Sequence, residues 1–201
     1  MKEQLQKDFE NTIRNLSLSQ KDIEIKKFSL DNFINKGFPN RREEDWKFSD
    51  LNQIINKNIG ELSFYNDYTS TNKVDTSVFV DGLVHNKIVF INGRIEKIDF
   101  DYEKKDQIEI IDQSEIINKF ENNNSLSDLN SAFTNKSFKI VVKKGYQLSK
   151  PLIIYHTTNS KIWSKNINLR LDFELQEDSS LRLIDLFLSL IHISEPTRPL
   201  D

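Results

Sequence analysis

Residues 138–155 (FKIVVKKGYQLSKPLIIY) decide the fold, because they hold two short apolar runs with a turn between them. Phe138–Val142 and Leu152–Tyr155 are rich in β-branched and aromatic residues, which is typical of buried strands. Gly145 and Pro151 mark the turn. Each run is too short to enclose a core by itself. The segment therefore predicts strands that pack against further strands of the same kind.

The same pattern continues toward the C-terminus. Ile167–Leu175 and Leu181–Ile184 are two more apolar runs, and Asp178 lies in the polar stretch between them. Regular stacking of such strands would produce one continuous core. A parallel β-helix, a β-sandwich and an antiparallel meander all agree with this spacing.

The first third of the chain predicts helices. Apolar residues recur every three or four positions along two stretches, Leu5, Phe9, Ile13 and Leu16 in the first and Phe28, Leu30, Phe33 and Ile34 in the second. Gly37 and Pro39 mark the end of the second helix. Residues 50–55 predict a further short helix, and residues 60–74 a linker or surface loop.

The middle of the chain predicts a hairpin followed by short elements. Ile88–Ile91 is a strand candidate, and Asn92–Gly93 is a strong two-residue hairpin signal. Residues 108–111 predict another strand. Residues 114–120 and 125–133 predict two short helices, the second capped by Ser125 or Ser127.

Composition excludes several classes of function. The 201 residues carry 28 basic and 31 acidic side chains, so no basic surplus is available to bind nucleic acid. No cysteine is present, which removes disulfides, thiolate metal sites and thiol nucleophiles. No apolar run is long enough to cross a membrane, and no signal segment opens the chain. A cytoplasmic protein is expected.

Motifs of catalysis are missing as well. His85, His156 and His192 stand in no metal-ligand spacing, and His156 is expected to be a polar residue at a strand edge. Asp172 and Glu174 share one face of a strand, where paired carboxylates would suit glycoside hydrolysis. A solvated face opposite Leu171, Phe173 and Leu175 is the preferred interpretation. We therefore expect no enzymatic activity.

The most distinctive segment is residues 37–51 (GFPNRREEDWKFSDL). It combines a helix stop, a charged turn and aromatic residues. Arg41 and Arg42 can pair with the acidic residues 43–45, and Trp46 and Phe48 are expected to dock on the helices. A structural role is predicted.

This segment also resembles the signature near the start of the SufD family of iron–sulfur cluster assembly proteins. Three further stretches resemble that family in order: residues 87–93 (KIVFING), 126–133 (LSDLNSAF) and 143–153 (KKGYQLSKPLI). The residues that carry the likeness are Gly37, Phe38, Pro39, Arg41, Glu43, Glu44, Trp46, Lys47, Asn92, Gly93, Asn130, Phe133, Gly145 and Pro151.

The resemblance implies an α+β chain that leads into a right-handed parallel β-helix. Residues 1–59 would be a helical region, 60–136 a linker with a β-hairpin and short helices, and 137–185 the start of the β-helix. It implies a non-catalytic scaffold that works with a SufB-like paralogue and a SufC-like ATPase. A transient iron–sulfur cluster is expected only in the full complex, with no cofactor or metal bound by this part.

The last stretch does not fit that family. Residues 188–198 (LSLIHISEPTR) match the translation of a transposase-type sequencing adapter, so residues 186–201 are expected to be a non-native tail on the front part of a longer protein. Two other functions remain open. A β-helix that binds or cleaves polysaccharide predicts secretion and a cleft lined by carboxylates, and a free-standing interaction module predicts a chain that closes its own core.

Overall fold

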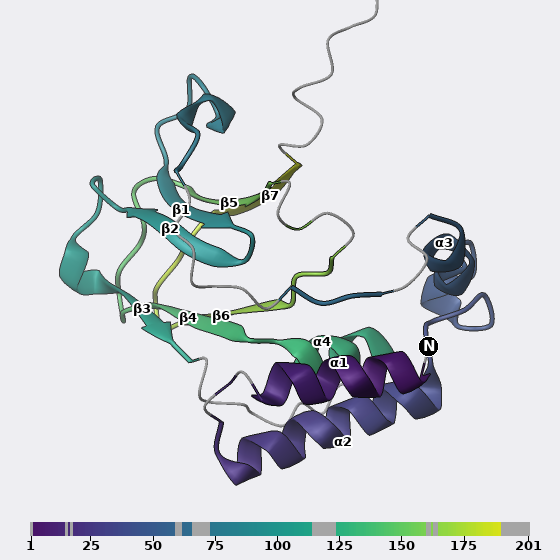
Figure 1. Cartoon of the computed structure of the whole chain (residues 1–201). Coiled ribbons are helices and arrows are strands. Elements are labelled where there is room, and N and C mark those ends of the chain that lie inside the picture. Colours follow the sequence, from purple (N-terminus) through teal and green to yellow (C-terminus); the bar gives the residue numbers. More distant parts are fainter. Residues whose placement is uncertain are drawn as a thin grey trace, which may run out of the picture. The chain divides into compact units, whose positions relative to one another are not determined.

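The computed structural model describes residues 2–14, 16, 18–58, 62–65, 73–113, 124–159, 162 and 165–189. Within them lie four α-helices and two β-sheets, so the expected α+β class is confirmed (Figure 1). The chain forms two compact units. Unit 1 comprises residues 1–66, 112–138 and 164–171, and unit 2 comprises residues 67–111, 139–163 and 172–201.

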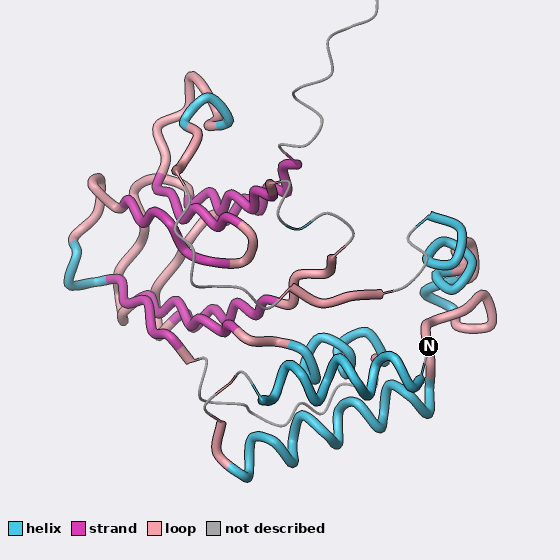
Figure 2. The backbone as a smooth tube through the Cα atoms, viewed as in Figure 1, coloured by secondary structure: helices cyan, strands magenta, loops and turns pink. Residues whose placement is uncertain are grey.

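Unit 1 contains the helices, namely α1 (Lys2–Arg14), α2 (Gln20–Lys36), α3 (Leu51–Asn58) and α4 (Ser125–Phe133), which Figure 2 draws in cyan. The predicted apolar positions Leu5 and Phe9 of α1, and Leu30 and Phe33 of α2, are buried together with Phe133 of α4. Phe28 was expected on the same stripe, but it is about half exposed. Its position falls on the side of α2 away from Leu30 and Phe33.

The ends of these helices follow capping rules. The Ser19 hydroxyl accepts a hydrogen bond from the Asp22 N–H (3.2 Å), which fixes the start of α2. Gly37 ends α2 with a φ of 74°, as predicted from sequence. At α4 the predicted serine caps are wrong, because the Asn124 side chain accepts from the Leu126 N–H instead (2.9 Å).

A buried lysine joins α2 to the end of α4. Lys26 Nζ donates to the carbonyl oxygens of Ser131, Ala132 and Thr134 at 3.3, 3.3 and 2.5 Å. Carbonyls at a helix C-terminus lack helical partners and carry partial negative charge, so a cation is stabilised there. Burial nevertheless lowers the pKa of Lys26 to about 8, against the raising effect of Asp22.

The segment predicted to be a linker is partly core. Residues 59–61 and 66–72 lie outside the described residues, but Leu62 and Tyr65 are buried. The Phe64 ring stacks on Phe133 with centroids 3.5 Å apart. Tyr65 N–H also donates to the Asn166 carbonyl (2.8 Å). The surface-loop prediction is wrong for residues 62–65, where aromatic side chains outweigh the polar composition around them.

Unit 2 opens with the predicted hairpin. β1 (Asn86–Ile91) and β2 (Arg94–Asp99) pair antiparallel, with a register shift between Val89 and Phe90. Asn92 and Gly93 have φ angles of 52° and 81°. Two successive left-handed residues are what a type I′ turn requires. The hairpin prediction is confirmed.

The first sheet has the order β2-β1-β5-β7, with β5 at Leu152–Thr158 and β7 at Leu183–Ser189. β1 and β7 both pair parallel with β5, and Leu152 lies between Asn86 and Leu183. A purely antiparallel meander is therefore excluded. Both faces of β1 and β5 are buried, which is typical of parallel strands inside a fold.

The second sheet has the order β3-β4-β6, formed by β3 (Ile108–Asp112), β4 (Lys136–Val142) and β6 (Leu169–Leu175). Hydrogen bonds beside β3 and β4 join Lys143 to Gln107 and Gln113 to Ser137, which is an antiparallel arrangement. Gln176 N–H donates to the Val142 carbonyl (3.1 Å), so β4 and β6 end side by side. From β4 to β7, successive strands alternate between the two sheets.

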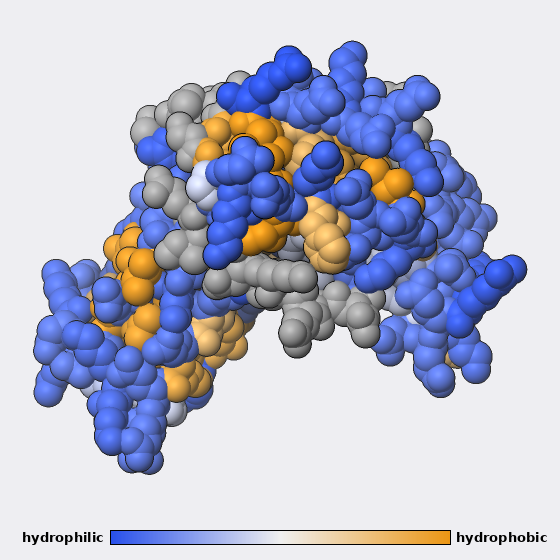
Figure 3. Space-filling model, turned by 90° about the horizontal axis from the view of Figure 1, so that it is seen from below, coloured by the Kyte–Doolittle hydropathy of each residue, from blue (hydrophilic) through white to orange (hydrophobic). Residues whose placement is uncertain are grey.

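All four strands predicted after residue 135 exist, with bounds shifted by a few residues. The parallel β-helix itself stays a prediction. The helix predicted at residues 114–120 and most of the predicted non-native tail lie outside the described residues, while residues 186–189 belong to β7. Hydrophilic residues cover most of the face drawn in Figure 3, with hydrophobic residues in smaller patches. In the described ranges, no helix has the length and apolar character that crossing a membrane requires.

Candidate interaction surface

Two consecutive segments of unit 2 share one strand–turn–strand plan. We call residues 139–158 the first coil and residues 172–189 the second coil. Their turns lie against each other through backbone hydrogen bonds. Gly145 N–H donates to the Glu177 carbonyl (2.9 Å), and Leu148 N–H donates to the Ser180 carbonyl (3.0 Å). The two coils are therefore stacked along their whole length, because β5 and β7 also pair in register.

Both turns contain a left-handed residue at the same position. Gly145 has a φ of 72°, and Asp178, 33 residues later, has a φ of 58°. Leu152 and Leu183, paired in β5 and β7, are 31 residues apart. Such a regular offset is typical of repeat architectures, in which each unit buries its apolar residues against the next.

The coils differ in exposure. Ile140, Val142, Leu152 and Ile153 of the first coil are at most 1% exposed, whereas their counterparts Phe173, Leu175, Leu183 and Ile184 are between 36% and 49% exposed. Phe187, the counterpart of His156, is 76% exposed. In the described part of the chain β7 is also the edge strand of its sheet. We call Phe173, Leu175, Leu183, Ile184 and Phe187 the interaction surface.

This surface corrects the expectation for β6. Phe173 and Leu175 were predicted to face a core, with Asp172 and Glu174 on the solvated side. Instead both apolar side chains are exposed, because the described residues supply no third coil above them. The Glu174 carboxylate pairs with Lys139, and the hydrogen bond from Lys139 lowers the pKa of Glu174. A general acid of a glycosidase needs a raised pKa, so this pair does not suit that role.

A buried carboxylate holds the turn of the first coil. Glu103 accepts hydrogen bonds from the Asn86 amide (2.9 Å), the Tyr146 hydroxyl (2.7 Å), the Ser149 hydroxyl (3.0 Å) and the backbone N–H groups of Ser149 and Lys150 (3.2 and 3.0 Å). Burial alone would raise the pKa of Glu103. The hydrogen bonds outweigh it and lower the pKa to about 2. Glu103 is thus an ionised anchor between the hairpin and the turn.

His156 is not the strand-edge residue that was predicted. It lies inside β5, and its ring stacks between Phe90 and Phe187 with centroid distances of 5.2 and 4.5 Å. Its Nε2 is 2.8 Å from Oδ1 of Asp185, a close contact that lacks the direction of a hydrogen bond. Burial lowers the pKa of His156 despite the opposing effect of Asp185. His156 is therefore uncharged near neutral pH.

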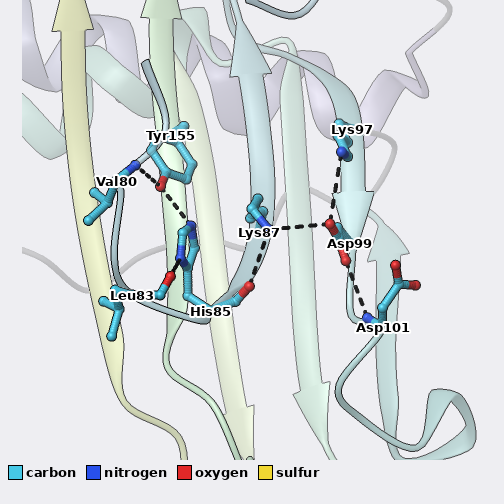
Figure 4. A network of polar contacts seen from close by, with 8 residues as sticks. All are labelled: Val80, Leu83, His85, Lys87, Lys97, Asp99, Asp101 and Tyr155. Atoms are coloured by element: carbon cyan, nitrogen blue, oxygen red, sulfur yellow. Dashed lines mark hydrogen bonds and ion pairs between the residues drawn. The ribbon is translucent and has the colours of Figure 1, made fainter. Parts of the chain in front are cut away.

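His85 belongs to a buried network that the sequence did not reveal (Figure 4). Its Nδ1 lies 2.5 Å from the Leu83 carbonyl, which can only accept, so Nδ1 carries the proton. Nε2 then accepts from the Tyr155 hydroxyl (2.8 Å), and that hydroxyl accepts from the Val80 N–H (3.0 Å). The network fixes residues 80–85 above β5. It is fully used in structure, which leaves no group for catalysis there.

The same figure shows a charged cluster on the hairpin. Lys87 and Lys97 both approach Asp99, at 3.3 and 3.8 Å, and Asp99 also accepts from the Asp101 N–H (3.3 Å). The two lysines and this hydrogen bond lower the pKa of Asp99, although burial acts in the opposite direction. The cluster ties β1 to β2 and needs no ligand to balance its charge.

In unit 1, the signature residues 37–39 have structural roles. Gly37 ends α2, Phe38 is buried against Phe33 with ring centroids 4.9 Å apart, and Pro39 is buried beside it. The turn that follows is held by Asn40. Its backbone N–H donates to the Glu43 carboxylate (3.1 Å), and its side-chain oxygen accepts from the Arg42 N–H (3.0 Å).

The rest of that segment is more exposed than predicted. No ion pair within 4.0 Å joins Arg41 or Arg42 to residues 43–45 in the described structure, and Arg41, Glu43, Glu44 and Lys47 are exposed. Trp46 is half-buried. Phe48 was expected to dock on the helices, but it is 91% exposed, with Lys47 Nζ 5.9 Å from its ring centroid. The docking prediction is wrong for Phe48, because the turn directs it outward.

The remaining signature residues support turns and packing. In unit 1, Phe133 is buried, and Asn130 accepts from the Asn168 amide (3.0 Å). In unit 2, Asn92 is buried, and its side chain exchanges hydrogen bonds with Asn159 (2.8 and 3.1 Å) beside the buried Gly93. Gly145 forms its turn, and the Pro151 carbonyl accepts from the Asn86 N–H (2.8 Å).

Sequence reasoning missed Glu103 and the repeat of the coils. The signal for the repeat was weak, because few residues of the two coils are identical. The described residues hold no group of three or more His, Asp or Glu side chains that could bind a metal ion. No protein-family model matches this chain, and a search of curated proteins gives no match either.

Proposed function

We propose that the chain is a SufD-like, non-catalytic scaffold component of the SUF iron–sulfur cluster assembly system. The observation that carries the proposal is the order of four signature stretches between Gly37 and Asp185, together with the stacked coils that follow the last of them. Parallel strands that alternate between two sheets at a fixed offset are the pattern expected for the start of a parallel β-helix.

In this proposal the coils begin a right-handed β-helix whose remaining strands cover the interaction surface. The partners are a SufB-like paralogue and a SufC-like ATPase in the cytoplasm, with no nucleic acid and no membrane. A transient iron–sulfur cluster belongs to the assembled complex, and none of the residues named above is assigned to it. The signature residues support the scaffold role through caps, turns and packing.

The test is complex formation by the gene read through to its own stop codon. Co-expression with SufB-like and tagged SufC-like partners should give a complex that survives affinity purification and size exclusion. An unrelated tagged ATPase serves as the control and should recover none of the chain. If the full-length product associates with neither partner, the scaffold proposal is lost.

The polysaccharide-binding alternative has less support. It requires a cleft of carboxylates, whereas Glu174 is paired with Lys139 and Glu103 is saturated with hydrogen bonds. A glycan-binding assay with the same full-length product would decide for it if the product bound polysaccharide and ignored both SUF partners.

A further inference from the structure

The two coils carry opposite charge. The first coil has four lysines and no acidic residue: Lys139, Lys143, Lys144 and Lys150. The second coil has five acidic residues and one arginine: Asp172, Glu174, Glu177, Asp178, Asp185 and Arg182. With His156 uncharged, the first coil has a net charge of +4 and the second a net charge of −4. This contrast lies between directly stacked neighbours.

The opposite charges meet where the coils touch. Lys139 pairs with Glu174 on the strands, and Lys144 pairs with Glu177 at the turns. Lys144 N–H also donates to the Gln176 side chain (3.0 Å), and the Arg182 guanidinium donates to the Ser149 carbonyl (3.2 Å). Complementary charge thus accompanies the apolar contact in the one interface between coils that the structure describes.

Part of the acidic charge of the second coil is not neutralised by the first. Asp178 lies at the tip of its turn and is exposed. Asp185 faces His156, but His156 is uncharged near neutral pH and leaves the carboxylate charge in place. Both residues lie in the second coil, the part of unit 2 that also forms the interaction surface.

We propose that the interaction surface receives a lysine- or arginine-rich pair of β-strands from a partner polypeptide, laid on the second coil as the second lies on the first. The inference rests on the proposed function only in taking β-strands as the cover of this surface. Apolar side chains and the open edge of β7 supply affinity, while the acidic residues select a basic partner over a neutral or acidic one.

The test uses the 201-residue chain and two synthetic peptides. One peptide has the sequence of residues 139–158 and serves as a basic strand pair, and the other replaces its four lysines by glutamate. Fluorescence anisotropy at low salt should show binding at least about tenfold tighter for the basic peptide. The difference should shrink at high salt, where charges on the surface are screened.

Variants of the chain locate the effect. Asp178→Asn with Asp185→Asn should reduce the preference for the basic peptide several-fold and leave apolar binding in place. Ile184→Lys should weaken binding of both peptides. Lys27→Ala, on an exposed position of α2, is the control and should change nothing.

Three outcomes overturn the inference: equal binding of the two peptides, binding of neither, or self-association of the chain that the basic peptide does not reduce. The last would make a second copy the occupant. None of these outcomes affects co-purification with SUF partners, so failure here and failure of the scaffold proposal are distinguishable.

Discussion

The first and second coils share a backbone plan but have different neighbours. The first lies between β1 and the second coil, while the described structure places nothing beyond the second. Equivalent leucine and isoleucine side chains are therefore core in one coil and surface in the other. An apolar strand pattern specifies which side chains need cover, and the neighbouring element decides whether they receive it.

The largest expected difference concerns one pair of isoleucines. Ile153→Lys should cost more than about 4 kcal/mol and unfold unit 2, because it buries an unpaired charge. Ile184→Lys should cost less than about 1 kcal/mol, since the lysine can extend its ammonium into solvent. Urea unfolding followed by circular dichroism measures both. Equal effects would show that the two coils are equally buried in solution.

The second prediction concerns the anchor that only the first coil has among the described residues. Glu103→Gln should destabilise the chain by about 1–3 kcal/mol, because a charged acceptor of five hydrogen bonds is replaced by a neutral amide. Glu109→Gln, an exposed change on β3, should stay within about 0.5 kcal/mol. Hydrogen exchange should accelerate at the amides of Ser149 and Lys150 only in the first variant.

Acid should remove the same anchor. The pKa of Glu103 is lowered to about 2 in the folded protein, from an ordinary value of 4.5. Its contribution is therefore fully present above about pH 5 and is lost as the pH falls toward 2. The stability difference between the wild type and Glu103→Gln should shrink over that range. A difference that stays constant down to pH 2 would contradict the ionised anchor.

Local patterns predicted most of the individual elements. Helical periodicity and the Gly37 stop located α2, and the Asn92–Gly93 pair located the hairpin, because these signals depend on residues close in sequence. The four strands after residue 135 were found for the same reason. What the strands pair with was left open, since an apolar run fits parallel and antiparallel neighbours equally well.

The features that escaped prediction depend on distant residues. Glu103 gave no signal, because its partners Tyr146 and Ser149 come more than forty residues later. Phe48 and Phe64 exchanged their expected places, since one polar turn points outward and one polar stretch packs inward. The interaction surface was also invisible, because exposure of Leu183 is a property of the neighbour and not of the strand.

A smaller effect should come from the left-handed residues of the two turns. Gly145→Ala should cost about 1 kcal/mol, since alanine is strained at a φ of 72°, although nothing lies within 4 Å of the added Cβ. Asp178→Gly should change the free energy of unfolding by less than that, in the stabilising direction, because it relieves the same strain. Thermal unfolding distinguishes the two signs. Two changes of the same sign would mean that the turns are not equivalent.

The smallest effect is expected from the ion pair between the turns. Lys144 and Glu177 are both about two-thirds exposed, and exposed ion pairs contribute little because water screens them. A double-mutant cycle with alanine at both positions should give a coupling energy near the error of the measurement, which falls further at high salt. The same charges act strongly on the choice of partner, since a mismatched strand would bring like charges together. A large coupling at this pair would instead assign the charge pattern of the coils to stability, and the preference for a basic partner would lose its physical basis.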